Sequence, residues 1–223
     1  MKAASVSDDL IFREVDEDVR RDQIEQYWKR YGTYFIAGAV LIVAITAAGV
    51  LWRNYQTEQR EADGARFEHA SQMAATDPAG AAEVFASLAA DGNGGYPALA
   101  AMREAEARVA AKDQSGALDV YQRLAADSGI EQGLRDIAAL KGGLLAEDMG
   151  QHDVAENLLT PLANGNGALK FAAREAIAGV QLGAGKRDAA IATLKSLSAD
   201  ALAPAGAKAR AGEILRVLGA EQE

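Results

Sequence analysis

Ala117-Leu-Asp-Val-Tyr121-Gln-Arg-Leu124 decides the fold, because three related segments occur elsewhere in the chain. They begin at Ala81, Ala155 and Ala190, so successive first alanines lie 36, 38 and 35 residues apart. Each segment has a small residue, then a large apolar or aromatic residue four positions later, and Leu three positions after that. On a helix these three positions share one face, where the alanine lets a neighbouring helix approach. We therefore predict that these residues pack between helices: Ala81, Phe85, Leu88, Ala117, Tyr121, Leu124, Ala155, Leu159, Leu162, Ala190, Leu194 and Leu197.

The stretches ahead of these segments predict the other half of each repeat. Lys112, Gly150 and Gly185 stand five residues before the last three alanines, and glycine suits the left-handed turn at the end of a helix. The unit is therefore helix, turn, helix. No unit buries its apolar face alone, so the units must stack. Partner helices are expected at residues 95–111, 130–149 and 168–184, and a last helix at residues 204–218.

The composition favours helices over strands. The chain has 223 residues with only 4 prolines, and β-branched and aromatic residues are sparse outside one apolar run. After residue 52 there are 17 basic and 24 acidic side chains, and a net charge of −7 disfavours nucleic acid as a partner. We predict an all-α fold, with one N-terminal transmembrane helix followed by a solenoid of helix pairs.

The apolar run from Tyr34 to Trp52 has 19 residues and no charged side chain. At about 1.5 Å per residue, a helix of this length reaches roughly 28 Å, close to the hydrocarbon thickness of a bilayer. A core helix this long normally has a polar face, and a cleaved signal peptide has a shorter apolar run and a basic leader. An uncleaved span in contact with membrane lipid is expected. Its membrane-interface anchors are predicted to be Trp28, Lys29, Arg30, Trp52 and Arg53.

Charges beside the span predict its orientation. Lys29 and Arg30 precede it directly and only Arg53 follows it directly, which favours a cytoplasmic N-terminus. The expected organisation is an acidic helical leader at residues 1–33, the span at residues 34–52, and a repeat domain at residues 53–223 on the far side of the membrane.

The repeats resemble a known family. A period near 34 residues with the pattern Gly-x-x-x-x-Ala-x-x-x-(large)-x-x-Leu is similar to the tetratricopeptide repeat, over about residues 64–219. Lys112 departs from the pattern at the turn glycine, and the first helices have Ala or Gly where the family usually has aromatic residues. The resemblance implies a stack of helix pairs that binds other proteins.

The order of segments resembles a narrower family. The leader contains Phe12-Arg-Glu-Val-Asp-Glu-Asp18, Trp28-Lys-Arg-Tyr-Gly32 precedes the span, and degenerate repeats follow it. This arrangement is similar to the bacterial ancillary subunits of the Sec translocon, which are inner-membrane proteins with a periplasmic repeat domain. The resemblance implies a bacterial inner-membrane location, and partners among Sec translocon subunits and periplasmic chaperones.

Residues suited to catalysis or metal binding are sparse. The chain has no cysteine, and its two histidines, His69 and His152, have no second His at metal-ligand spacing. The glycine-rich stretches 91–95 and 164–167 are not followed by the Lys-Ser/Thr of a phosphate-binding loop. We expect no enzyme activity, no metal site and no cofactor.

The concave side of a solenoid, lined mainly by the first helix of each pair, can bind a segment of a partner. The candidate groove residues on these helices are Leu99, Met102, Ile137, Leu140 and Leu144. Burial within the stack is the commoner fate of such an apolar stripe, and it remains the alternative. Two functions fit: an accessory that holds chaperones or emerging clients near the Sec channel, or a self-associating cell-envelope scaffold without client binding.

Overall fold

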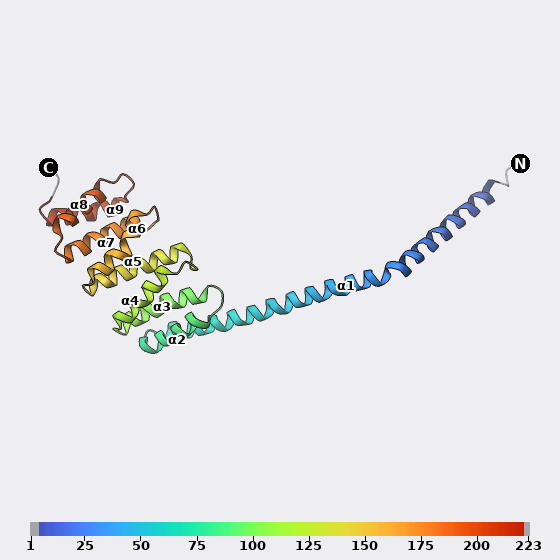
Figure 1. Ribbon diagram of the computed structural model, residues 1–223, viewed down its shortest axis with the longest axis horizontal. Coiled ribbons are helices and arrows are strands. Elements are labelled where there is room, and N and C mark those ends of the chain that lie inside the picture. Colours follow the sequence, from blue (N-terminus) through green and yellow to red (C-terminus); the bar gives the residue numbers. More distant parts are fainter. Residues whose placement is uncertain (1–4, 221–223) are drawn as a thin grey trace. The chain divides into compact units, whose positions relative to one another are not determined.

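The computed structural model describes the backbone of residues 5–220 and the side chains of residues 28–220. Within these residues the chain is helical and has no strand, as predicted (Figure 1). It divides into two compact units, Met1–Glu58 and Gln59–Glu223, and the second holds all the helix pairs. The helices are α1 (Ser5–Met73), α2 (Pro78–Asp91), α3 (Tyr96–Ala110), α4 (Gln114–Ala126), α5 (Gln132–Asp148), α6 (His152–Asn164), α7 (Lys170–Gly183), α8 (Arg187–Ala199) and α9 (Ala205–Val217).

Helix α1 contains the whole apolar run. It has 69 residues, and the first proline of the chain is Pro78, which begins α2, so no proline interrupts α1. Its most apolar 18-residue window has a mean hydropathy of 2.4, and none of that window is buried. Thr46 has the one aliphatic hydroxyl in the run, and its Oγ1 donates to the carbonyl of Ile42 at 2.8 Å. By length and composition this helix qualifies as a membrane anchor or a signal sequence.

The side chains of the leader motif at residues 12–18 lie outside the described residues. The backbone of α1 is helical from Ser5 onward and continues through the apolar run to Met73, so its last turns form the first helix of the first pair.

The turns between helix pairs repeat one geometry, and this explains why the repeat is visible in the sequence. Lys112, Gly150, Gly185 and Gly219 all have positive φ, between 63° and 72°. The residue after each donates its N–H to a carbonyl five positions back, as Asp113 does to Arg108 at 2.8 Å. This is the glycine-type end of a helix, and it confirms the turn predicted at Lys112, Gly150 and Gly185.

The second helices begin with a capping carboxylate in two of the pairs. The side chain of Asp77 accepts the N–H of Gly80, and that of Asp113 accepts the N–H of Gly116, each at 3.0 Å. The first helices are found within two residues of the predicted bounds, at α3, α5 and α7, and α9 is the predicted last helix.

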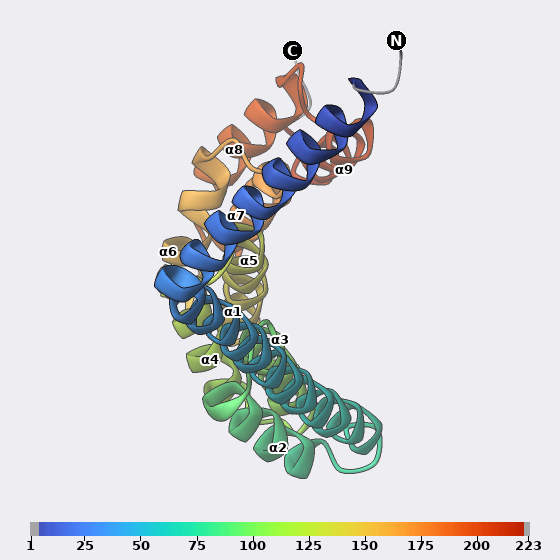
Figure 2. The same cartoon turned by 90° about the vertical axis from the view of Figure 1, so that its right-hand side faces the viewer.

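Each helix of the second unit packs on the next one along the chain, and α5 also contacts α7, as α7 contacts α9. Figure 2 shows α2 to α9 following an arc, with α4 and α6 on its outer side and α3 and α5 on its inner side. First helices therefore line the inner side of the arc.

Three clusters of buried side chains hold the second unit together. The first cluster joins α1, α2 and α3 around Phe85 and Leu88; the second joins α3 to α7 around Tyr121 and Leu159; the third joins α7, α8 and α9 around Leu194. Of the twelve repeat positions named above, eleven are buried and only Leu162 is partly exposed.

Close helix contacts explain two of the glycines in α5. A Cβ added at Gly142 would lie 2.9 Å from Cβ of Tyr121, and one at Gly143 would lie 2.6 Å from Cγ of Leu159. Both distances are shorter than van der Waals contact, so α5 approaches α4 and α6 closely only because these positions lack a side chain.

Candidate functional site

A groove of about 1170 Å³ opens between α3 and α5. Although α5 contacts α7 and α7 contacts α9, α3 and α5 have no comparable direct contact. The ends of α2 and α4 lie beneath the gap, and the stretch from Gly129 to the first turn of α5 closes one side. The groove therefore lies where the first and second clusters of buried side chains meet on α3.

The groove has apolar side chains on both walls, and charged side chains also line it, namely Glu104, Arg108, Arg123, Asp127 and Glu131. Leu99 of α3 is 48% exposed and Ile137 of α5 is 40% exposed, and both line it. Ile130 and Leu134 continue the wall and are half-buried. Small residues form much of the remaining surface, among them Ala86, Ala89, Ala98 and Gly133.

Leu99 and Ile137 lie 38 residues apart, the same spacing as the turn residues Lys112 and Gly150. They are thus equivalent positions of successive repeats, and the fold brings them to one groove. Ile130, Leu134 and Ile137 are spaced four and three residues apart, a helical pattern from which the first two could have been included among the candidates.

The other three candidates lie elsewhere. Met102 is 7% exposed and belongs to the second cluster, so it is a core residue, and its place in the groove was a misassignment. Leu140 is partly buried against the same cluster. Leu144 is exposed on α5, one turn beyond Leu140, but it does not line the groove. For Met102 and Leu140, burial in the stack is the better description.

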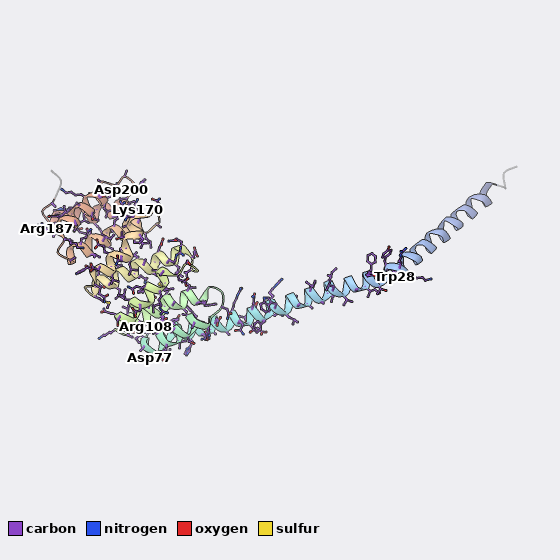
Figure 3. All side chains as sticks on the ribbon, viewed as in Figure 1. Trp28, Asp77, Arg108, Lys170, Arg187 and Asp200 are labelled. Carbon is purple, nitrogen blue, oxygen red and sulfur yellow. The ribbon has the colours of Figure 1, made fainter. Side chains whose placement is uncertain are left out.

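An ion-pair chain lies along the α3 side of the groove. The Glu104 carboxylate is buried, and its Oε1 accepts from Nε of Arg108 at 2.8 Å. Arg108, labelled in Figure 3, also donates from a terminal nitrogen to Oδ2 of Asp113 at 2.8 Å. This hydrogen bond, with the N–H of Gly116, holds the pKa of the Asp113 carboxyl below its usual value. The hydrogen bond to Asp113 likewise raises the pKa of Arg108.

An ion pair joins α3 to α5 beyond the groove. Nζ of Lys141 lies 2.8 Å from Oε1 of Glu106, and Arg103 donates to the other oxygen of Glu106 at 2.8 Å. Burial raises the pKa of Glu106, but the hydrogen bonds from Lys141 and Arg103 outweigh it, and the net pKa is lowered. The equivalent contact between α9 and α7 is the two-bond pair of Arg210 with Glu175, at 2.6 and 2.7 Å.

Residues 25–165 match the family described as a tetratricopeptide repeat-like domain, over more than half of the chain. The chain belongs to this family. Searches of curated proteins and of solved structures found no match. Tetratricopeptide repeat-like domains are typically non-enzymatic modules for protein–protein interaction, and protein partners are the general expectation for this one.

Within residues 28–220, the tetratricopeptide repeat-like domain and the helix before it contain no group of three His, Asp or Glu side chains placed to hold a metal ion. His152 contacts Glu147 across the α5–α6 turn, with Nδ1 3.1 Å from Oε2. The groove presents exposed apolar side chains, among them Leu99 and Ile137, to solvent.

The five predicted interface anchors are exposed on α1, and Trp28 is labelled in Figure 3. The rings of Trp52 and Tyr55 are tilted by 37° with centroids 6.4 Å apart, and the Arg30 guanidinium lies 5.9 Å from the centroid of Tyr31. Amphipathic rings and cations of this kind are favoured at the surface of a bilayer. Their role as membrane anchors stays a prediction.

Proposed function

We propose that this chain is a membrane-anchored, non-enzymatic interaction module whose groove between α3 and α5 binds a segment of a partner protein. The groove carries the proposal. Its volume of about 1170 Å³ exceeds the roughly 300 to 1,000 Å³ of small-molecule sites. Exposed Leu99 and Ile137 provide the apolar contacts that a docked segment would bury.

We assign residues 34–52 of α1 as the membrane span, residues 1–33 to the cytoplasm, and residues 53–223 to the periplasm of a bacterial inner membrane. The exposed, uncharged surface of the run supports a span, since water is a poor solvent for so many apolar side chains. The two cations before the span and the one directly after it support the direction.

We further propose that the partners are subunits of the Sec translocon, together with periplasmic chaperones or the clients that emerge from the channel. The order of leader, span and repeats supports this assignment. A tethered groove also works at high effective concentration near the channel, so weak contacts suffice for binding.

Retention of Sec channel subunits in mild detergent tests the groove directly. Leu99→Glu and Ile137→Glu put a charge on each wall of the groove, and both should reduce the Sec subunits that co-purify with the full-length chain. Val217→Glu is the matched control, because Val217 is an exposed apolar residue outside the groove, and it should leave retention unchanged.

Equal retention by Leu99→Glu and Val217→Glu would contradict a role for the groove. If Sec subunits are absent from the wild-type preparation and a differently tagged second copy is present, the chain is a self-associating scaffold instead. A topology reporter fused after Glu223 tests the direction of the span, and a cytoplasmic signal would overturn the periplasmic assignment.

A further inference from the structure

One rim of the groove is a loop that has few restraints of its own. Residues 92–95 join α2 to α3, and Gly94 and Gly95 line the groove. Three of these four residues are glycine, and Gly94 has φ of +65°. Glycine loses the most backbone freedom on folding, so a loop of this composition needs contacts from outside to keep one conformation.

Helix α1 provides such contacts through a buried carboxylate. The Asp63 side chain is only 4% exposed. Its Oδ2 accepts two hydrogen bonds from Asn93, one from the backbone N–H at 2.8 Å and one from Nδ2 at 2.9 Å. A buried carboxyl oxygen needs hydrogen-bond donors, and the two N–H groups of Asn93 provide them. Asp63 therefore holds Asn93, the second of the four loop residues, in place.

Neighbouring residues hold α1 in the position that this contact needs. Arg66, one turn after Asp63, donates to Oδ1 of Asp91 at 3.0 Å and to Oγ of Ser87 at 3.0 Å, both on the last turns of α2. The hydrogen bond with Asp91 raises the pKa of Arg66. Gly64 allows a close approach to α3, because a Cβ there would lie 2.9 Å from the hydroxyl of Tyr96.

We infer that Asp63 is a positioning residue of the groove: through its two hydrogen bonds to Asn93 it sets where the rim at Gly94 and Gly95 stands relative to α5. This inference rests on the proposed function, since it concerns the same groove. It states that the rim of the groove is held in place by α1, the helix that also contains the apolar run. Asp63 and Asn93 are 30 residues apart, and neither side chain lines the groove itself.

Spin labels across the groove measure the rim position in the full-length protein without any partner. The chain has no cysteine, so introduced cysteines are the only labelling sites. Gly95→Cys and Gly133→Cys place labels on the rim and on α5, and both positions have open space around an added Cβ. Gly179→Cys and Gly212→Cys form a reference pair on α7 and α9, with the same open surroundings.

With Asp63 intact, the rim pair should give one narrow distance by pulsed electron paramagnetic resonance. Asp63→Ala should replace it with a broad distribution and leave the reference pair unchanged. Asp63→Asn should restore much of the narrow distance, because its carbonyl can still accept the backbone N–H of Asn93. An unchanged rim distance in Asp63→Ala, or equal broadening of both pairs, would overturn the inference.

A matched carboxylate separates positioning from stability. Asp200 accepts the N–H of Leu202 at 2.9 Å and pairs with Arg174 at 2.9 Å, far along the chain from the groove. Asp200→Ala should lower the urea midpoint without broadening the rim pair, and broadening there would also overturn the inference. Failure of the proposed function has a separate readout. In that case Leu99→Glu and Val217→Glu would retain Sec subunits equally, while the spin-label distances across the rim would still respond to Asp63→Ala.

Discussion

Gly143 lies in the middle of α5 with its Cα against buried Leu159 of α6. A Cβ at this position would lie 2.6 Å from Cγ, 2.7 Å from Cδ2 and 3.1 Å from Cδ1 of that leucine. Leu159 is fully buried in the second cluster, so it has no free space into which to move. We therefore expect Gly143→Ala to strain the α5–α6 contact.

Two opposing effects set the magnitude. Replacing glycine with alanine inside a helix stabilises it by roughly 0.5 to 1 kcal/mol. Overfilling a packed core costs about 1 to 3 kcal/mol. The net expectation for Gly143→Ala is a loss of up to about 2.5 kcal/mol in the free energy of unfolding.

Gly179→Ala is the matched control, because Gly179 lies inside α7, is exposed, and has nothing within 4 Å of an added Cβ. It should raise the free energy of unfolding by roughly 0.5 to 1 kcal/mol. Since the helix-propensity effect is common to both variants, the difference between them isolates the strain, about 1 to 3 kcal/mol.

Urea unfolding of a fragment of residues 59–223, followed by far-UV circular dichroism, measures both variants. This fragment contains every residue of the three clusters. If Gly143→Ala stabilises the fragment as much as Gly179→Ala does, α5 and α6 are not as close as described, and the packing argument is refuted.

Lys112→Gly should stabilise the same fragment by about 0.5 to 1 kcal/mol in urea unfolding. Lys112 has φ of 66°, which strains a residue with a Cβ, and the relief of this strain exceeds the cost of the greater backbone entropy that glycine gives the unfolded chain. Leu124→Ala should cost about 2 to 5 kcal/mol in that assay, since Leu124 is buried in the second cluster. Burial, with a smaller effect of Glu106, raises the pKa of Tyr121 to about 12. The folded state holds this phenol proton more tightly, so the stability it adds is complete below pH 10 and is lost as pH rises toward 12. Tyr121→Phe should make the fall in urea midpoint above pH 10 shallower, and an unchanged slope would contradict the assignment.

The repeat could be predicted from the sequence because its signals are local. Ala117, Tyr121 and Leu124 lie within two turns of one helix, and Lys112 stands at a fixed distance before them. Even the departure at Lys112 kept the left-handed turn, since the same hydrogen bonds form around it as around Gly150. Packing of neighbouring elements and the turn geometry outweigh the preference of one residue.

The groove was only partly predictable. Leu99 and Ile137 are equivalent positions and could be named, but Met102 has a similar apolar character and lies on the face of α3 that packs into the core. Leu99 and Met102 are three positions apart, so a rotation of only roughly 60° around the helix separates the groove face from the core face, and composition does not record it. The contact of Asp63 with Asn93 joins residues 30 positions apart, so no spacing rule points to it.

The division of the core into three clusters has a consequence for how the length of such a chain can vary. The groove uses α2 to α5, whereas α8 and α9 pack around the third cluster alone. In a stack where each unit depends mainly on its neighbours, helices at the far end can be added, exchanged or opened locally without disturbing the first units. The end that follows α7 can therefore vary with the least effect on the groove. A repeat domain shortened to end after α7 would need polar side chains on the surface of α7 that α8 and α9 cover.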